Sequence, residues 1–322
     1  MNIILAIVGL VAGFILLVKG ADFFVDGASS IAKQLHIPPI VIGLTIVAFG
    51  TSAPELAVSI SAALKGSNDI AIGNVVGSNI FNLLIVVGIS AMIFPLHVKK
   101  SIIKKDYPIS LIAAVLLGAL AMDTLFGKPN MELTRIDGII LLVGFSIFMI
   151  LVIREGMQGR AESLQNEEEE MVIGYGLGKS FLICLIGLAG IVFGGNMVVD
   201  GAKSIARAAG LSEAFIGLTI VAFGTSLPEL VTSIVAAKKG ESDISLGNVV
   251  GSNIFNIFLI LGVSATISPM TVSSTYLYDI AILIVISVVF FIPIIKTKKV
   301  SRGVGTAMTG TYIAYMAYLF MR

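Results

Sequence analysis

The sequence predicts an all-α polytopic membrane protein with ten transmembrane helices in two inverted repeats of five helices. Two observations carry this prediction. The first is composition: 57% of the 322 residues are hydrophobic, 13% are charged and the mean hydropathy is +1.02, whereas a soluble domain has about 25% charged residues. The second is an internal repeat, in which segments of the first half recur 174 residues later without a gap.

The repeat is clearest in two motifs. Residues 42–52 read IGLTIVAFGTS and recur unchanged at 216–226, and each run continues to a Pro-Glu pair. Residues 73–82 read GNVVGSNIFN and recur at 247–256. Each copy therefore carries one glutamate in the middle of an apolar stretch. A duplicated apolar half with one central acid per copy is typical of membrane transporters that hold an ion between their repeats.

Ten apolar segments approach the roughly 20 residues that a spanning helix needs. They cover 2–32, 40–64, 70–95, 103–122, 136–153, 177–207, 214–237, 244–268, 277–295 and 303–321. Five helices per copy is an odd number, so the second copy must enter the membrane from the opposite side. The two repeats are therefore expected to be inverted.

The chain divides into an N-terminal five-helix repeat (1–154), a linker (155–175) and a C-terminal five-helix repeat (176–322). The linker is acidic, with glutamates at 167–170, and is expected to be a solvated loop, with a weak Ca²⁺ patch as the alternative. If the linker is cytoplasmic, most lysines and arginines of the loops fall on the cytoplasmic side, as the positive-inside rule requires. Both termini are then expected outside the cell membrane.

Several aspartates lie near the expected helix ends. Asp69 and Asp243 stand where the N-caps of the third and eighth helices are expected. Asp22, Asp26 and Asp200 lie toward the ends of long helices, where we expect interfacial capping or pairing rather than ion binding.

The segment Gly50-Thr51-Ser52-Ala53-Pro54-Glu55 predicts a break in the second helix near the bilayer centre. Pro54 has no N–H, and its ring opposes the carbonyl of Gly50 four residues earlier. Carbonyls freed at that depth are tolerated only where they line a cavity or meet a ligand. Thr51, Ser52 and Glu55 add side-chain oxygens within about one turn. In the seventh helix the same roles fall to Gly224, Thr225, Ser226, Pro228 and Glu229.

The second motif supplies further oxygens. Asn74, Ser78 and Asn82 are spaced four residues apart on one helical face. The second copy repeats this pattern with Asn248, Ser252 and Asn256. If the two copies meet face to face, the midplane gathers two carboxylates with hydroxyls, amides and bare carbonyls, and neither motif contains His or Cys. Such an all-oxygen site suits Ca²⁺, which takes about 6–8 oxygen ligands, and also Na⁺.

With these motifs the chain resembles the cation/calcium exchanger superfamily, the membrane antiporters that include Na⁺/Ca²⁺ exchangers. Gly-Thr-Ser-x-Pro-Glu followed by Gly-Asn-x-x-Gly-Ser-Asn, given twice, is similar to the two alpha repeats of that family, and the resemblance covers essentially the whole chain. It implies alternating access by sliding of the first and sixth helices against the core. The cation ligands that it implies are the backbone carbonyls of Ala48 and Ala222 and the side chains of Thr51, Ser52, Glu55, Ser78, Asn82, Thr225, Ser226, Glu229, Ser252 and Asn256.

The sequence-based prediction is therefore an electrogenic Na⁺/Ca²⁺ antiporter that exports Ca²⁺ from a prokaryotic cell, driven by the Na⁺ gradient. Some relatives in the superfamily, K⁺-dependent ones among them, carry Asp where this chain has Asn256, which favours K⁺ independence here. K⁺-dependent or H⁺-coupled exchange remains the alternative, although the Gly-Asn-x-x-Glu motif usual in proton-coupled members is absent.

Other classes of function are disfavoured. A passive cation channel usually needs cyclic assembly, whereas a duplicated chain closes its own site. An intramembrane enzyme would need catalytic groups that these repeats lack, and no basic tract suits nucleic acid. We expect no cofactor, with Ca²⁺ and Na⁺ as transported substrates and the lipid bilayer as partner. A monomer suffices for this site, and the oligomeric state stays open.

Overall fold

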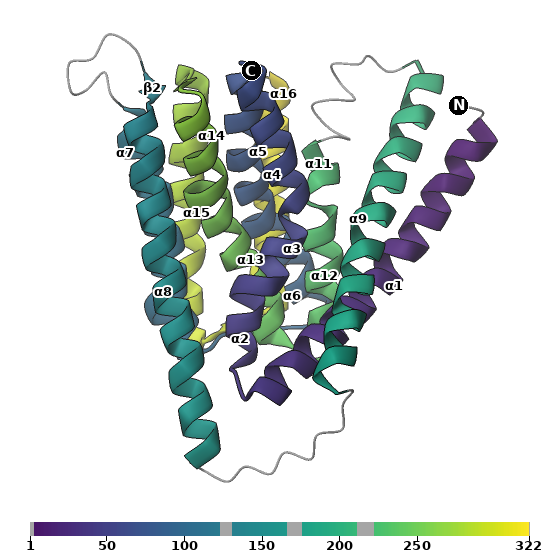
Figure 1. Cartoon of the computed structure of the whole chain (residues 1–322). Coiled ribbons are helices and arrows are strands. Elements are labelled where there is room, and N and C mark those ends of the chain that lie inside the picture. Colours follow the sequence, from purple (N-terminus) through teal and green to yellow (C-terminus); the bar gives the residue numbers. More distant parts are fainter. Residues whose placement is uncertain (1–2, 123–130, 166–175, 211–221, 322) are drawn as a thin grey trace.

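The computed structural model describes residues 3–122, 131–165, 176–210 and 222–321, and almost all of them are helical (Figure 1). Within these ranges, six helices are long and apolar enough to cross a membrane, and a bent pair, Pro39–Thr51 with Ala53–Leu64, makes a seventh. The six are Ile3–Leu35, Asn68–Ile93, Arg135–Glu162, Leu177–Ala208, Ser242–Ile267 and Ser274–Thr297.

The elements of the first half follow the expected segments closely. In order they are α1 (Ile3–Leu35), α2 (Pro39–Ile42), the π-helical turn η1 (Gly43–Val47), α3 (Ala48–Thr51), α4 (Ala53–Leu64), α5 (Asn68–Phe81), the π-helical turn η2 (Asn82–Val86), α6 (Val87–Ile93), β1 (Leu96–His97), the π-helical turn η3 (Ile102–Asp106), α7 (Tyr107–Ala121), β2 (Glu132–Leu133) and α8 (Arg135–Gln165).

The second half repeats this order where it is described. Its elements are α9 (Leu177–Ala208), α11 (Ala222–Thr225), α12 (Leu227–Lys238), α13 (Ser242–Ile254), the π-helical turn η6 (Phe255–Leu261), α14 (Gly262–Ile267), β3 (Met270–Thr271), α15 (Ser274–Thr297), β4 (Lys299–Val300) and α16 (Arg302–Met321). The start of the expected seventh helix, 214–221, lies outside the described residues.

The expected loop over 155–175 is wrong for its first part, because α8 continues to Gln165. The extension has two glutamates and two glutamines, with one each of Met, Arg, Ala and Leu, which are good helix formers, and it contains two glycines but no proline. It is also held by an ion pair between Lys105 and Glu155. The remainder, 166–175, with its four glutamates, lies outside the described residues.

The expected N-caps are also wrong by two residues. α5 follows Ser67 and α13 follows Glu241, so Asp69 and Asp243 lie inside the first turn of each helix. A carboxylate there still interacts favourably with the positive end of the helix dipole. Asp243 additionally pairs with Lys99 at 2.5 Å, which links the start of α13 to the loop before α7.

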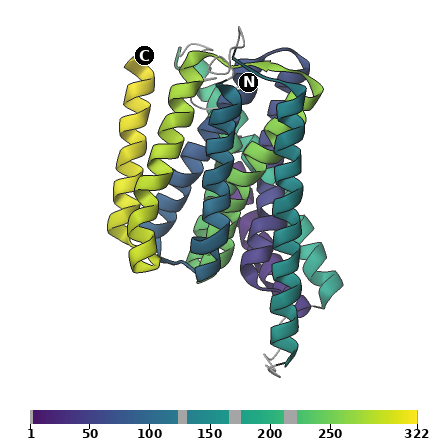
Figure 2. The same ribbon diagram turned by 90° about the vertical axis from the view of Figure 1, so that its left-hand side faces the viewer.

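The centre of the molecule is formed by α5–η2–α6 and α13–η6–α14. In each of these helices, 78% of the apolar window is buried, against 22–39% in the other four helices that pass the membrane-span test. Two short antiparallel strand pairs, β1 with β4 and β2 with β3, join the two halves of the chain. The long helices run alongside one another in both views (Figures 1 and 2). The two central helices therefore place their motifs deep in the interior.

α1 and α9 pack against each other along their length at one side of the molecule (Figure 1). Glycines line the contact at intervals of seven residues: Gly13, Gly20 and Gly27 on α1, and Gly187, Gly194 and Gly201 on α9. A Cβ on Gly20 would lie 2.6 Å from Ile191 N, and one on Gly194 would lie 2.5 Å from Leu17 N. The missing side chains therefore allow the two backbones to meet directly.

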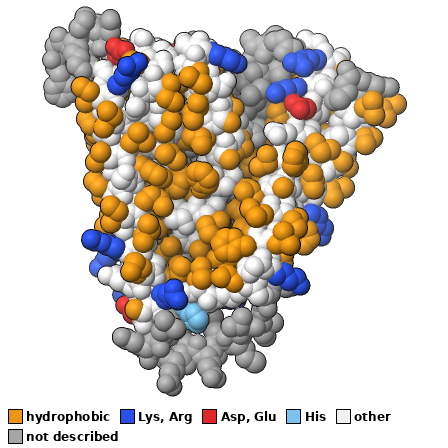
Figure 3. Space-filling model, viewed as in Figure 1, with side chains coloured by type: hydrophobic (Ala, Val, Ile, Leu, Met, Phe, Trp, Pro, Cys, Tyr) orange, Lys and Arg blue, Asp and Glu red, His pale blue; other side chains and the backbone are white. Residues whose placement is uncertain are grey.

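The outer surface fits a bilayer. Hydrophobic side chains cover the middle of the face in Figure 3, and lysines and arginines gather toward its two ends. Many of these apolar residues belong to α1, α8 and α9, whose outward side chains include Ile4, Ile147 and Phe193. A belt of this kind is what lipid tails require, since they cannot pair with exposed polar groups.

Candidate cation site

Both predicted helix breaks are present. The path of the chain bends by 50° between Pro39–Thr51 and Ala53–Leu64, where Ser52 leaves helical geometry with φ −82° and ψ 6°. Ser226 has nearly the same geometry, φ −93° and ψ 6°, between α11 and α12. Pro54 and Pro228 lie in the first turn of the helices that follow, where a missing N–H costs nothing. Each break therefore turns the N-terminus of a helix that carries a glutamate toward the interior.

The two glutamates are fully buried, and each is held by a serine of the other copy. Glu55 and Glu229 are both 0% exposed. Ser226 Oγ donates to Glu55 Oε1 at 3.0 Å, and Ser52 Oγ donates to Glu229 Oε1 at 3.0 Å. This exchange of partners across the repeat brings the two carboxylates into one site.

The serines of the second motif join the same group. Ser78 Oγ lies 3.0 Å from Ser226 Oγ, and Ser252 Oγ lies 3.5 Å from Glu229 Oε1. Both side chains are buried. The hydroxyls of both motifs therefore surround the carboxylates, as the spacing of the sequence predicts.

The threonines meet the first asparagine of the opposite motif. Thr51 Oγ1 lies 2.9 Å from Asn248 Oδ1, and Asn248 Nδ2 donates to Ser233 Oγ at 2.9 Å. The equivalent contacts in the other half involve Thr225, Asn74 and Ser59. Thr51 Oγ1 also lies 3.3 Å from the carbonyl of Ala48, which accepts the Ser52 N–H at 3.0 Å. Ala222 is the first residue of α11.

Four asparagines form a cluster between α5–η2 and α13–η6. Asn82 begins η2 and Asn256 lies in η6, so both stand at π-helical turns, which occur frequently at functional sites. Asn82 Nδ2 donates to Asn253 Oδ1 at 3.2 Å, and Asn256 Nδ2 donates to Asn79 Oδ1 at 3.0 Å. All four side chains are buried.

Four oxygens of the site are buried with no hydrogen-bond partner in the part of the chain that the structure describes. They are Glu55 Oε2, Glu229 Oε2, Asn82 Oδ1 and Asn256 Oδ1. Buried polar atoms are almost always paired, so a matched set of unpaired acceptors indicates a place for a cation. Among the described residues there is no group of three or more His, Cys, Asp or Glu side chains. The site therefore offers two carboxylates with neutral oxygens, a donor set suited to Ca²⁺ and Na⁺.

Part of this arrangement was not predicted from the sequence. Asn79 and Asn253 were not expected in the site, nor were Ser59 and Ser233, which accept from the first asparagines of the motifs. A signal was available for the asparagine pair, because both members lie inside the repeated ten-residue motif at the common offset. The serines carry the same offset but no motif of their own.

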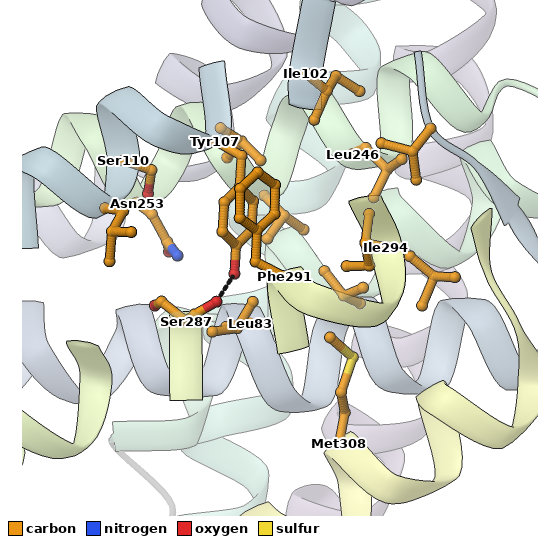
Figure 4. Close-up of a pocket in the computed structure, with 16 residues that line it drawn as sticks. Leu83, Ile102, Tyr107, Ser110, Leu246, Asn253, Ser287, Phe291, Ile294 and Met308 are labelled. Carbon is orange, nitrogen blue, oxygen red and sulfur yellow. Dashed lines mark hydrogen bonds between the residues drawn. The ribbon is translucent and has the colours of Figure 1, made fainter. Parts of the chain in front are cut away.

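A small cavity lies beside Asn253 (Figure 4). Its volume is about 30 Å³, and its lining is mostly aliphatic and aromatic, with Tyr107 Oη donating to the carbonyl of Ser287 at 2.9 Å. Asn253 is the member of the asparagine cluster that lines it. Its described lining contains no carboxylate, so the cavity differs from the central site.

The outlying aspartates pair as expected. Lys239 Nζ lies 2.9 Å from Asp22 and 2.7 Å from Asp26, which ties α1 to the loop between α12 and α13. Partial burial would lower the pKa of Lys239, but the hydrogen bonds and charges of Asp26 and Asp22 outweigh it and raise that pKa above its ordinary value. Asp200 lies 3.8 Å from Lys203 on its own helix. These acids belong to pairs outside the central site.

The family described as "Sodium/calcium exchanger protein" matches residues 5–154 and 179–321 of the chain. The chain belongs to the sodium/calcium exchanger family. Members of this family are transporters, so the protein is a membrane antiporter and not an enzyme.

Individual relatives match this exchanger-family chain over nearly its full length. It is 36% identical to the inner membrane protein YrbG of Escherichia coli, over 98% of the chain and 97% of the relative. It is 35% identical to the sodium/calcium exchanger MaX1 of Methanosarcina acetivorans, over 97% of each protein. A solved structure of the sodium-calcium exchanger NCX_Mj superimposes with a TM-score of 0.84 at 34% identity, covering 98% of this chain and 99% of the other.

Proposed function

We propose that this chain exchanges Na⁺ for Ca²⁺ at one central site shared by the two repeats, by alternating access and without a requirement for K⁺. The observation that supports this most directly is the pair of buried glutamates, each with one oxygen held by the opposite repeat and one oxygen unpaired within the described residues. The proposed ligands are the twelve residues named from the resemblance. Six of them are hydrogen-bonded to one another in two groups, Ser52 with Glu229 and Ser252, and Ser78 with Ser226 and Glu55.

The proposed mechanism is competition for the two carboxylates. One Ca²⁺ or several Na⁺ neutralise them, whereas the empty site keeps two charges inside the bilayer. Each such charge costs at least about 2.5 kcal/mol at the bilayer centre. The empty carrier therefore resists the switch between its two access states. Because only the ion-bound carrier switches, transport of one ion is coupled to transport of the other. The hydroxyl and amide oxygens offer places for more than two Na⁺, and exchange of more than two Na⁺ for one Ca²⁺ is electrogenic.

The proposed architecture is ten spanning helices in two inverted five-helix repeats, with α1 and α9 sliding against the core. In support, the N- and C-termini lie at the same end of the molecule, and α8 reaches the opposite end before the linker (Figure 1). Five crossings per repeat would put the linker on the side of the membrane opposite to both termini. Loop charge favours both termini outside and the linker in the cytoplasm. An inward Na⁺ gradient would then drive Ca²⁺ out of the cell.

Two other proposals concern partners. We propose that no cofactor takes part, since Ca²⁺ and Na⁺ are cargo and the site draws its oxygens from protein groups. One chain supplies the proposed ligands from both repeats, so a monomer suffices. K⁺-dependent or H⁺-coupled exchange remains the alternative, and the counter-ion loaded into vesicles separates these from the proposed coupling.

The test of the site is conversion of each glutamate to its neutral isostere. Glu55→Gln and Glu229→Gln should each reduce Ca²⁺ exchange in proteoliposomes to the level of protein-free vesicles. With one carboxylate left, a divalent ion is undercompensated in a medium of low dielectric constant. Folding should persist, because the amide oxygen still accepts from Ser226 or Ser52.

Asp200→Asn is the matched control, because the Asp200 side chain is 73% exposed and lies outside the site. It removes a carboxylate in the same way and should leave exchange unchanged. Exchange at the wild-type rate in either glutamate variant would contradict the assignment.

A further inference from the structure

Asn79 of α5 and Asn253 of α13 hold each other's backbone across the boundary between the repeats. Asn79 Nδ2 donates to the carbonyl of Asn253 at 3.2 Å, and Asn253 Nδ2 donates to the carbonyl of Asn79 at 3.4 Å. The two residues are 1% and 6% exposed. A main-chain carbonyl can only accept, so the amino end of each side-chain amide must face the opposing carbonyl. The orientation of both amides is thereby fixed.

This orientation passes on to a second pair of amides. The oxygen ends of Asn79 and Asn253 accept from Asn256 Nδ2 at 3.0 Å and from Asn82 Nδ2 at 3.2 Å. If Asn82 or Asn256 turned by half a rotation, its oxygen would face another oxygen, since an amide donates at one end only. The Oδ1 atoms of Asn82 and Asn256 are therefore held away from the pair, and both are buried without a partner among the described residues.

We propose that Asn79 and Asn253 are positioning residues that present the carbonyl oxygens of Asn256 and Asn82 to the transported cations. The inference rests on the proposed function, because it takes Asn82 and Asn256 as ligands. Each positioning residue acts on the ligand of the opposite repeat. Asn79 and Asn253 are each oriented by a hydrogen bond to a backbone carbonyl, and rotation of a side chain cannot turn that carbonyl into a donor.

The orientation matters because a reversed amide turns a ligand into a repulsive group. An amide presents a partially negative oxygen at one end and two N–H donors at the other. A cation meeting the N–H end loses one ligand and gains an unfavourable dipole. Partners of this kind, which orient metal ligands without touching the metal, typically change affinity by about 10–100-fold when they are removed.

A packing role and a positioning role predict different behaviour in a double-mutant cycle. If Asn79 only packs α5 against α13, its loss should harm the protein whether or not Asn256 keeps its side chain. If Asn79 acts through Asn256, its loss should have no further effect once the Asn256 amide is gone, since the two residues then share one energetic contribution.

The experiment compares Asn79→Ala, Asn256→Ala and the double variant of the full chain in proteoliposomes. The readouts are the Ca²⁺ concentration for half-maximal exchange, the maximal rate, and thermal unfolding in detergent. We expect Asn79→Ala to raise the half-maximal Ca²⁺ concentration about ten-fold. The half-maximal Ca²⁺ concentration of the double variant should equal that of Asn256→Ala within about two-fold. Asn79 is the better first target, because truncation of Asn253 would also enlarge the cavity that it lines.

Ser90→Ala and Ser264→Ala are the matched controls. Both serines are buried hydroxyls of the same central helices with no hydrogen-bond partner in the described structure, and they lie outside the cluster. Removing them should leave the half-maximal Ca²⁺ concentration unchanged. The symmetric cycle of Asn253→Ala with Asn82→Ala should repeat the result of the first cycle.

The outcomes separate this inference from the proposed function. If Glu55→Gln keeps wild-type exchange, the site assignment fails and the positioning role fails with it. If Glu55→Gln abolishes exchange but Asn79→Ala leaves the half-maximal Ca²⁺ concentration unchanged, only the positioning role is overturned. The positioning role is also overturned if the two substitutions act independently, so that the double variant raises the half-maximal Ca²⁺ concentration by the product of the effects of Asn79→Ala and Asn256→Ala. Failure of both Asn79→Ala and Asn253→Ala to insert overturns it as well, because the pair is then a packing element.

Discussion

At the scale of single residues, charge in the site is confined to two carboxylates. Glu55 and Glu229 carry it, whereas Asn82 and Asn256 offer neutral oxygens at equivalent places in the two repeats. In the proposed mechanism, one Ca²⁺ therefore neutralises the site completely. A third carboxylate in the same fully buried place would leave one charge that only a further cation could balance.

Asn256→Asp tests this reasoning against Asn74→Asp. Asn256 is 1% exposed within the central cluster, whereas Asn74 is only partly buried. The added charge at 256 should shift the Na⁺ dependence of Ca²⁺ flux or introduce stimulation by K⁺, and the same change at 74 should do so less because solvent screens it. Ca²⁺ flux titrated with Na⁺ and with K⁺ measures both. Wild-type titrations for Asn256→Asp would remove the physical basis for K⁺ independence.

The residues that gather at the centre were predictable from the sequence, and their hydrogen-bond partners were not. A repeat at a fixed offset, a proline beside a glutamate and oxygen-bearing residues on one helical face identify Glu55, Ser78 and Asn82 without knowledge of the fold. The role of Asn79 depends on which residues of the other repeat lie opposite it. That information arises only when α5 and α13 pack, so the motif alone cannot supply it.

At the scale of helices, the contact between α1 and α9 depends on glycine. Backbone meets backbone along a line of glycines spaced by seven residues in each helix. Direct backbone contact holds the two helices close together, which suits a pair proposed to slide as one unit against the core. The offset of 174 residues relates the two glycine series, so the feature was present in the sequence, but the spacing alone does not say which helix is the partner.

Gly20→Ala and Gly194→Ala should destabilise this contact. A Cβ at either position would lie within 2.6 Å of backbone atoms of the other helix, and overpacking of this kind costs about 1–3 kcal/mol. We expect a lower unfolding temperature in detergent and slower exchange. Gly9→Ala is the control on the same helix, since a Cβ there meets nothing within 4 Å. Equal behaviour of all three variants would show that close approach is unimportant.

Two features of the helices were beyond the sequence. No sequence pattern distinguishes the π-helical turns η2 and η6 from ordinary apolar helix, because such turns arise where a helix adapts its path to the packing around it. The extension of α8 past residue 154 was mistaken for a loop because it is polar. Helix propensity and the ion pair of Glu155 with Lys105 maintain it where the hydropathy pattern ends.

At the scale of the whole molecule, the two repeats form one site and neither repeat forms it alone. Each glutamate accepts from a serine of the other half, and Asn82 and Asn256 each donate to an asparagine of the other half. Composition and the internal repeat predicted a membrane protein with a shared central site, and the contacts across the repeat agree with that. The coupling of ions is a property of the complete chain and has to be measured on it.

The central claim is tested most directly by radiolabelled Ca²⁺ uptake into sealed proteoliposomes loaded in turn with Na⁺, with K⁺ or with a proton gradient. We expect uptake only with Na⁺ inside, and faster uptake at an inside-positive potential, because exchange of more than two Na⁺ for one Ca²⁺ moves net positive charge outward. Uptake without internal Na⁺, or driven equally well by K⁺ or by the proton gradient, would contradict the proposed Na⁺/Ca²⁺ exchange.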